Sequence, residues 1–308
     1  MKTETGINIQ TGLIQLLFFW LLLGLTCPTL ANEVTQKYKG LTLNANLEMA
    51  EGKDFKDGVV LIVHGLQAHN RMEIIESSQQ VMVDNGQSSL AINLGLGINN
   101  RRGFYECSWP HRHGFNNAAD EIHAWVNWLK QQDSGKIVLM AHSLGGTQAL
   151  VYSSKFPKDK IDSLILLAPA TAGYDRLKKD YRLRYDKSLD DVLERANKMI
   201  ESGKGKQLMQ NTDFFYCPKA DVAAETFNDY YRKDSAFSQT PDFVQRLKIP
   251  ILIIAGSEDE RQPDVIRHLL PLADGKKIQL KVIESAGHFF RDLNIEEAIE
   301  LAVEFIQN

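Results

Sequence analysis

Buried apolar runs recur along the chain from residue 58 onward, and most are separated from the next run by a segment with helical spacing. Short runs rich in β-branched residues are typical of strands buried on both faces of a parallel sheet. The runs occupy residues 58–63, 88–94, 136–141, 163–167, 249–255 and 278–283. Helical spacing is found at 72–85, 118–130, 145–156, 263–272 and 295–306. This alternation predicts an α/β fold with a doubly wound, mostly parallel sheet.

Two segments depart from this alternation. Residues 38–49 alternate between apolar and polar positions, which predicts an antiparallel pair of half-exposed strands. No buried run is found at 171–248, where the patterns are charged and helical, the clearest at 188–202 with Ser188 as its N-cap. We therefore expect a helical cap inserted at 171–248. The core of the fold would then comprise residues 32–170 and 249–308.

Ser143 lies in a predicted strand-to-helix turn with the sequence Ala141-His142-Ser143-Leu144-Gly145. A serine between an apolar strand and a helix, with small residues two positions before and after it, is typical of a nucleophile elbow. Small residues are needed there because larger side chains would clash with the adjacent strand. Ala141 replaces the more common glycine but keeps this steric condition. Ser143 is therefore the candidate nucleophile.

A serine hydroxyl needs a neighbouring base, and the base needs an acid that holds it in one tautomer. His288 follows the last buried run, and Asp259 follows the run before it. Both residues would thus lie at strand ends, where a doubly wound sheet gathers functional groups. The chain order of serine, acid and histidine is the order that this architecture uses. Glu258 and Asp175 remain alternatives for the acid.

These motifs, in this order, resemble those of the α/β-hydrolase superfamily over essentially all of the chain after residue 31, with a cap. The resemblance implies that Ser143 is the nucleophile, that His288 acts as general base and then acid, and that Asp259 orients the histidine. It further implies a serine hydrolase of the carboxylesterase or lipase type, which cleaves an ester or thioester through an acyl-enzyme and needs no cofactor.

The resemblance also implies an oxyanion hole formed by the backbone N–H groups of Leu66 and Leu144. Two other functions share the fold. An aminopeptidase of the prolyl-aminopeptidase type would need acidic cap residues that bind a free amino group, for which Asp190, Asp191 and Glu194 are available. A non-catalytic binding protein would be expected to lack the serine or the histidine, and this chain has both.

A long loop rich in arginine and histidine follows the second buried run. Arg101, Arg102 and His111 are candidates for binding an anionic group of the substrate. The alternative is that these charges are solvated or pair with acidic residues of the cap. His111 and His113 form a His-x-His motif, but no acidic or cysteine cluster other than Cys107 accompanies them, so we expect no metal site.

Residues 1–31 have the features of a secretory signal peptide. Lys2 precedes an apolar run at 13–25, and Thr29-Leu30-Ala31 provides small residues before a cleavage site at Asn32. The run is short for a bilayer span, although an uncleaved membrane anchor is the alternative. We therefore expect a secreted or periplasmic protein without strong membrane association after cleavage.

The composition is that of an ordinary folded protein, with 44% hydrophobic and 24% charged residues. The net charge of −4 gives no reason to expect binding to nucleic acid. The expected partner is a small acyl substrate. Of the three cysteines, Cys27 lies in the predicted leader, which leaves Cys107 and Cys217. An even number of cysteines in an exported chain favours a disulfide between these two.

Overall fold

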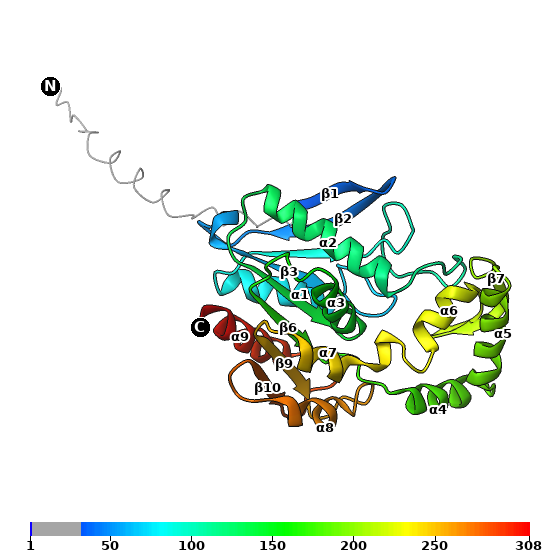
Figure 1. Cartoon of the computed structure of the whole chain (residues 1–308). Coiled ribbons are helices and arrows are strands. Elements are labelled where there is room, and N and C mark those ends of the chain that lie inside the picture. The colour runs from blue at the N-terminus through cyan, green and yellow to red at the C-terminus, as the bar shows by residue number, and fades with distance from the viewer. Residues whose placement is uncertain (2–31) are drawn as a thin grey trace. The chain divides into compact units, whose positions relative to one another are not determined.

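The computed structural model describes residue 1 and residues 32–308, and its largest element is an eight-stranded sheet (Figure 1). The predicted signal peptide therefore lies outside the described residues. The strands occur in the order β1-β2-β4-β3-β5-β6-β9-β10; β2 pairs antiparallel with both β1 and β4, and every other neighbouring pair is parallel. The predicted doubly wound, mostly parallel sheet is confirmed. The strands are β1 (Asn32–Tyr38), β2 (Leu41–Glu48), β3 (Val59–Val63), β4 (Ser89–Asn93), β5 (Ile137–His142), β6 (Ser163–Leu167), β9 (Ile251–Gly256) and β10 (Ile278–Ile283).

Helices cover both faces of this sheet (Figure 1). One face packs against α2 (Phe115–Gln131), α3 (Leu144–Lys155) and α8 (Val265–Leu269), and the other against α1 (Glu73–Asp84) and α9 (Leu293–Gln307). Alternate residues of one strand enter different cores because successive side chains point to opposite faces. The central strands β3, β4, β5, β6 and β9 are therefore buried at every position. No helix within residues 32–308 combines the length and the apolar character that crossing a bilayer would require.

The segment between β6 and β9 contains helices and a small second sheet. It consists of α4 (Tyr174–Tyr185), α5 (Leu189–Glu201), β7 (Leu208–Phe214), β8 (Cys217–Ala223), α6 (Ala224–Tyr231) and α7 (Thr240–Arg246). Ser188 caps α5 as predicted, since its hydroxyl accepts a hydrogen bond from the N–H of Asp191. The hairpin β7–β8 was not predicted, and the expectation of a purely helical segment is wrong in this respect. We call residues 171–248 the insertion.

The first hairpin begins earlier than its pattern indicates. The antiparallel pair expected at 38–49 runs from Asn32 to Glu48. Its turn lies at Lys39 and Gly40, both of which have positive φ angles of 47° and 81°. Glycine adopts such angles readily, whereas lysine does so at some cost. The turn therefore depends on Gly40 rather than on the apolar pattern of the strands.

Candidate active site

Ser143 lies at the point where β5 ends and α3 begins. Its backbone has a φ of 55° and a ψ of −124°, a conformation that costs a non-glycine residue roughly 1–3 kcal/mol. Gly145 is required beside it, because a Cβ atom there would lie 2.4 Å from the carbonyl oxygen of His64. The strand order also changes direction here, since β4 and β5 flank β3 on opposite sides. Such a switch point opens a crevice at the carboxyl ends of the strands.

Ser143, His288 and Asp259 form a continuous chain of hydrogen bonds. The Oγ atom of Ser143 lies 3.0 Å from Nε2 of His288, and Nδ1 of the same ring lies 2.9 Å from Oδ2 of Asp259. All three residues are at most 8% exposed. The structure thus brings together the three residues that the sequence singled out for catalysis. Neither Asp175 nor Glu258 is a hydrogen-bond partner of His288 within residues 32–308.

The surroundings of Asp259 favour its charged form. Burial alone would raise the pKa of this carboxyl group, but hydrogen bonding to His288 and the charge of that ring oppose the effect. The N–H groups of Arg261 and Gln262 donate to Oδ1 at 2.9 and 2.8 Å. Together these contacts lower the pKa of Asp259 below its ordinary value. An ionised Asp259 can therefore hold the His288 ring with Nδ1–H donating and Nε2 facing Ser143.

His142 supports the loop after β10, which contains His288. Burial lowers the pKa of this histidine to about 3, so the ring is neutral. Its Nε2 lies 2.9 Å from the backbone carbonyl oxygen of His288, to which it donates a hydrogen bond. In the sequence His142 is distinguished only by its position before Ser143. The structure shows in addition that His142 fixes the backbone of His288.

The loop after β3 runs beside the nucleophile. A Cβ atom on Gly65 would lie 3.1 Å from the Cβ atom of Ser143, so only glycine lets the loop approach this closely without displacement. Leu66 and Leu144 both line the cavity that contains Ser143. Neither of their backbone N–H groups has an acceptor among the residues that the structure describes. Two unoccupied donors near a nucleophile are what an oxyanion hole requires.

Arg101 does not line this cavity. It is 2% exposed, and its guanidinium donates hydrogen bonds to protein atoms on several sides. The acceptors are the carbonyl oxygens of Leu94, Gly103 and Ala68 and the side chain of Asn93. Arg101 therefore holds the loop after β4 in place, and the prediction that it binds substrate is corrected.

Arg102 and His111 also lie outside the cavity. Arg102 forms an ion pair with Glu33 of β1. His111 is completely buried, and its ring lies 4.9 Å from Tyr105 and 5.0 Å from Phe214 between ring centroids. Within residues 32–308 no group of three or more potential metal ligands is found. The substrate-binding prediction for these two residues is therefore corrected as well.

The cavity that contains Ser143 has a volume of about 230 Å³ and is lined by both the core and the insertion. The core contributes Ser143, His288, Leu66 and Leu144. The insertion contributes mostly aromatic and basic side chains, among them Tyr181, Arg184, Tyr185, Phe215, Tyr216 and Tyr231. Sequence reasoning missed these residues, because nothing in their spacing indicates which of them face the nucleophile.

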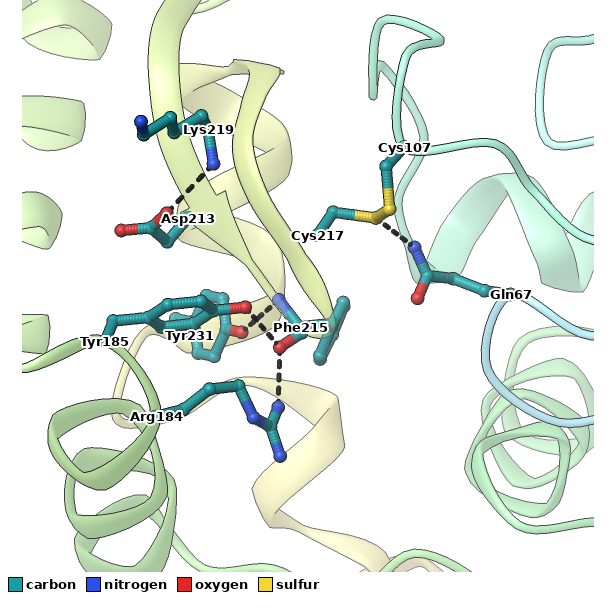
Figure 2. The surroundings of a disulfide bond; sticks show 9 residues. All are labelled: Gln67, Cys107, Arg184, Tyr185, Asp213, Phe215, Cys217, Lys219 and Tyr231. Atoms are coloured by element: carbon teal, nitrogen blue, oxygen red, sulfur yellow. Dashed lines mark hydrogen bonds between the residues drawn. A yellow bond between two sulfur atoms is a disulfide. The ribbon is translucent and has the colours of Figure 1, made fainter.

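A disulfide joins the insertion to the core (Figure 2). Cys107, in the loop after β4, is bonded to Cys217 at the start of β8, and the Cα atoms are 5.2 Å apart. The bond that the cysteine count predicts is therefore present. The side-chain amide of Gln67, next to the oxyanion loop, donates to the Cys217 sulfur at 2.9 Å. The disulfide thus fixes the β7–β8 hairpin close to the oxyanion loop.

Known proteins are similar to this chain in sequence or in fold. The chain is 26% identical over 175 residues to a Mycoplasma pneumoniae protein named "Putative esterase/lipase 3", over 52% of this chain and 60% of the relative. The aligned region thus spans less than two thirds of that relative. Est1E from Butyrivibrio proteoclasticus, in a structure with ferulic acid bound, is similar in fold with a TM-score of 0.63 at 20% identity. The superposition covers 89% of this chain and all of that one.

A second solved structure is also similar in fold. The monoacylglycerol lipase of Paleococcus ferrophilus matches with a TM-score of 0.55 and 19% identity, over 86% of this chain and 98% of that one. These likenesses establish the α/β-hydrolase fold. Residues 55–291 match the family model described as serine aminopeptidase, S33. Because that match spans more than half of the chain, the protein belongs to this family of α/β-hydrolases.

Proposed function

We propose that the protein is an exported serine hydrolase that cleaves a carboxylic ester or thioester through an acyl-enzyme on Ser143. The observation that carries this proposal is the chain of hydrogen bonds from Ser143 through His288 to Asp259, which begins in an open cavity. The names of two proteins described above, "Putative esterase/lipase 3" and a monoacylglycerol lipase, support the same class of reaction.

The reaction follows from the position of each group. The Oγ atom of Ser143 attacks the carbonyl carbon while Nε2 of His288 accepts its proton. The N–H groups of Leu66 and Leu144 stabilise the negative charge on the carbonyl oxygen. His288 then protonates the departing alcohol or thiol, which leaves the acyl group on Ser143. A water molecule that gives its proton to His288 releases the acid and restores the serine.

Aminopeptidase activity has less support. A free amino group would need an unpaired carboxylate in the cavity, and none of the acidic residues considered for this role, Asp190, Asp191 and Glu194, lines it. Asp190 pairs with Lys178, and Glu194 pairs with Lys198. The carboxylate that lines the cavity, Asp180, pairs with Arg176. The arginines of the cavity would repel an ammonium group.

A panel of substrates tests the proposal. Aryl esters of graded chain length, matching thioesters and aminoacyl anilides are offered to the purified protein. We expect hydrolysis of esters or thioesters, loss of nearly all activity in Ser143→Ala, and unchanged activity in Ser154→Ala, an exposed serine of α3. Preferential cleavage of the anilides would favour an aminopeptidase. Absence of all hydrolysis would favour a binding protein.

We infer export from the predicted leader and from the Cys107–Cys217 disulfide, since such bonds persist in oxidising compartments. The amino-terminal sequence of the protein recovered from its source cells tests this inference. We expect the mature chain to begin at Asn32. An intact leader would point to the membrane-anchored alternative.

A further inference from the structure

Three arginines line the cavity of Ser143, and they differ in how their charges are balanced. Arg176 of α4 pairs with Asp180 at 3.4 Å and with Asp264 at 3.2 Å. Arg184 of α4 and Arg261, which follows β9, form no ion pair with any carboxylate within residues 32–308. The cavity thus has two positive charges that no nearby acidic group neutralises.

These two charges converge on one aromatic ring. The guanidinium carbon of Arg184 lies 4.4 Å from the ring centre of Tyr216, and that of Arg261 lies 5.9 Å from the same centre. Arg261 also donates a hydrogen bond to the Tyr216 hydroxyl at 3.2 Å. The ring attracts each cation but does not cancel the repulsion between them. An anion bound beside Tyr216 would remove that repulsion.

Both arginines are held by their surroundings but keep donors free. Nη1 of Arg184 donates to the carbonyl oxygen of Phe215 at 2.5 Å, in the turn between β7 and β8 (Figure 2). The same turn is fixed by a hydrogen bond from the Phe215 N–H to the Tyr231 hydroxyl and by the disulfide at Cys217. Each guanidinium retains N–H groups for which no acceptor is found within residues 32–308.

The arrangement is also tied to the catalytic residues. The backbone N–H of Arg261 donates to Asp259, so its position is set by the same loop that orients His288. The carboxylate that lines the cavity, Asp180, forms an ion pair with Arg176. A substrate group that reaches the two arginines would therefore meet free planar donors, which match the geometry of a carboxylate.

Resting on the proposed function, we propose that the substrate is an ester or thioester that carries a second, free carboxylate away from the bond that is cleaved. Arg184 and Arg261 bind that carboxylate beside Tyr216, and the aromatic side chains of the insertion contact the body of the substrate. The arginines that select the substrate are thus not Arg101 and Arg102, which the sequence indicated.

Two pairs of esters, each a free carboxylate and its methyl-capped form, test this inference. The first pair is 4-nitrophenyl hydrogen suberate and its methyl-capped form, which have the carboxylate on the acyl side. The second is 4-acetoxybenzoate and its methyl ester, which have it on the alcohol side. We expect kcat/KM to be on the order of tenfold higher for the charged member of one pair. Added salt should reduce the preference because it screens exposed charges.

Variants then identify the residues responsible. In Arg184→Gln and Arg261→Gln the ratio of kcat/KM between charged and capped esters should fall, and in the double variant it should approach one. Arg182→Gln is the matched control: it lies on the same helix, pairs with Asp186 and does not line the cavity. It should leave the ratio and the activity unchanged.

The outcomes separate this inference from the proposed function. Hydrolysis of the capped esters with no preference for charge in either pair would overturn the inference and leave the hydrolase proposal standing. Failure to hydrolyse any of the four esters would contradict both. A preference that persists in the double variant would likewise overturn the assignment to Arg184 and Arg261.

Discussion

Two aspartates follow strands of the sheet near the nucleophile, and their surroundings differ. Asp259 is 5% exposed and accepts hydrogen bonds from His288 and from two backbone N–H groups. Asp175 lies in the first turn of α4, where its charge is favourable to the helix dipole. Asp259 is therefore suited to orient His288, and Asp175 is suited to stabilise the start of α4.

Replacing each aspartate by asparagine tests this difference. Asp259→Asn should reduce kcat by roughly three to four orders of magnitude, because the amide favours the wrong tautomer of His288. Asp175→Asn should leave kcat close to that of the unmodified protein. Steady-state hydrolysis of one aryl ester measures both values. A large loss in Asp175→Asn with little loss in Asp259→Asn would show that the acid is wrongly assigned.

At the scale of elements, the loop after β4 is held by two buried polar side chains, Arg101 and Glu121. Arg101 bonds to the carbonyl groups described above, and Glu121 of α2 accepts hydrogen bonds from the N–H groups of Gly95 and Leu96 at 2.6 and 2.9 Å. The loop contains Cys107 and is therefore connected through the disulfide to the insertion. The conformation of this loop should therefore affect both the core and the cavity.

The neighbouring residues Arg101 and Arg102 provide a matched comparison of stability. Arg101→Gln should lower the free energy of unfolding by about 3–5 kcal/mol, because several buried carbonyl groups lose their donor. Arg102→Gln removes an exposed ion pair and should cost less than about 1 kcal/mol. Chemical denaturation monitored by fluorescence measures both. Equal losses would contradict the structural role of Arg101.

The disulfide should stabilise the folded protein mainly by restricting the unfolded chain. With a sequence separation of 110 residues, the chain-entropy model gives about 4–5 kcal/mol. We expect a reducing agent to lower the melting temperature of the protein. The Cys107→Ser, Cys217→Ser double variant should already melt at the lower temperature and should not respond to the reductant. A melting temperature that reduction leaves unchanged would contradict this role.

At the scale of the whole molecule, several histidines are buried in their neutral form. Burial lowers the pKa to about 3 for His64, His113 and His142 and to about 4 for His111. A histidine whose pKa is lower in the folded state stabilises the protein fully above its unfolded pKa, and this stability is lost as the pH falls below that value. Glu121 acts in the opposite direction, since burial raises its pKa to about 7.

The free energy of unfolding should therefore fall as the pH is lowered from about 7 to about 5. Each of the four histidines lowers the free energy of unfolding by up to about 2 kcal/mol over this interval. Their sum exceeds the opposing contributions of Glu121 and of Glu48, whose pKa burial also raises. Denaturant titrations at a series of pH values measure the trend. Stability that stays constant or rises on acidification would show that these histidines are not buried and neutral.

The sequence predicted best the elements whose burial is complete. The fully buried strand β6 has the boundaries that its apolar run indicates, and the fully buried strands β3, β4 and β5 lie within one residue of theirs. The hairpin β7–β8 escaped prediction because Gln210 and Asn211 interrupt its apolar positions and its register shifts twice. Strands buried on both faces are recognisable because apolar residues are favoured at every position. An irregular, half-exposed hairpin lacks such a pattern because its conformation depends on tertiary contacts.

The site was predictable to the extent that its residues follow strands. Ser143, Asp259 and His288 each follow the end of a buried run, so their proximity follows from the topology of a parallel sheet. Arg184 and Arg261 come together only through the packing of the insertion on the core, which no local pattern specifies. The prediction that Arg101 binds substrate was wrong because a charged residue in a long loop is usually exposed, whereas this one is buried.

Covalent labelling of Ser143 tests the central claim most directly. The purified protein is treated with a fluorophosphonate, and the modified peptide is identified by mass spectrometry. We expect one adduct per chain on Ser143, formed far more slowly in His288→Ala because the base that activates the hydroxyl is missing. An adduct on a different serine, or ester hydrolysis that continues in Ser143→Ala, would contradict the account.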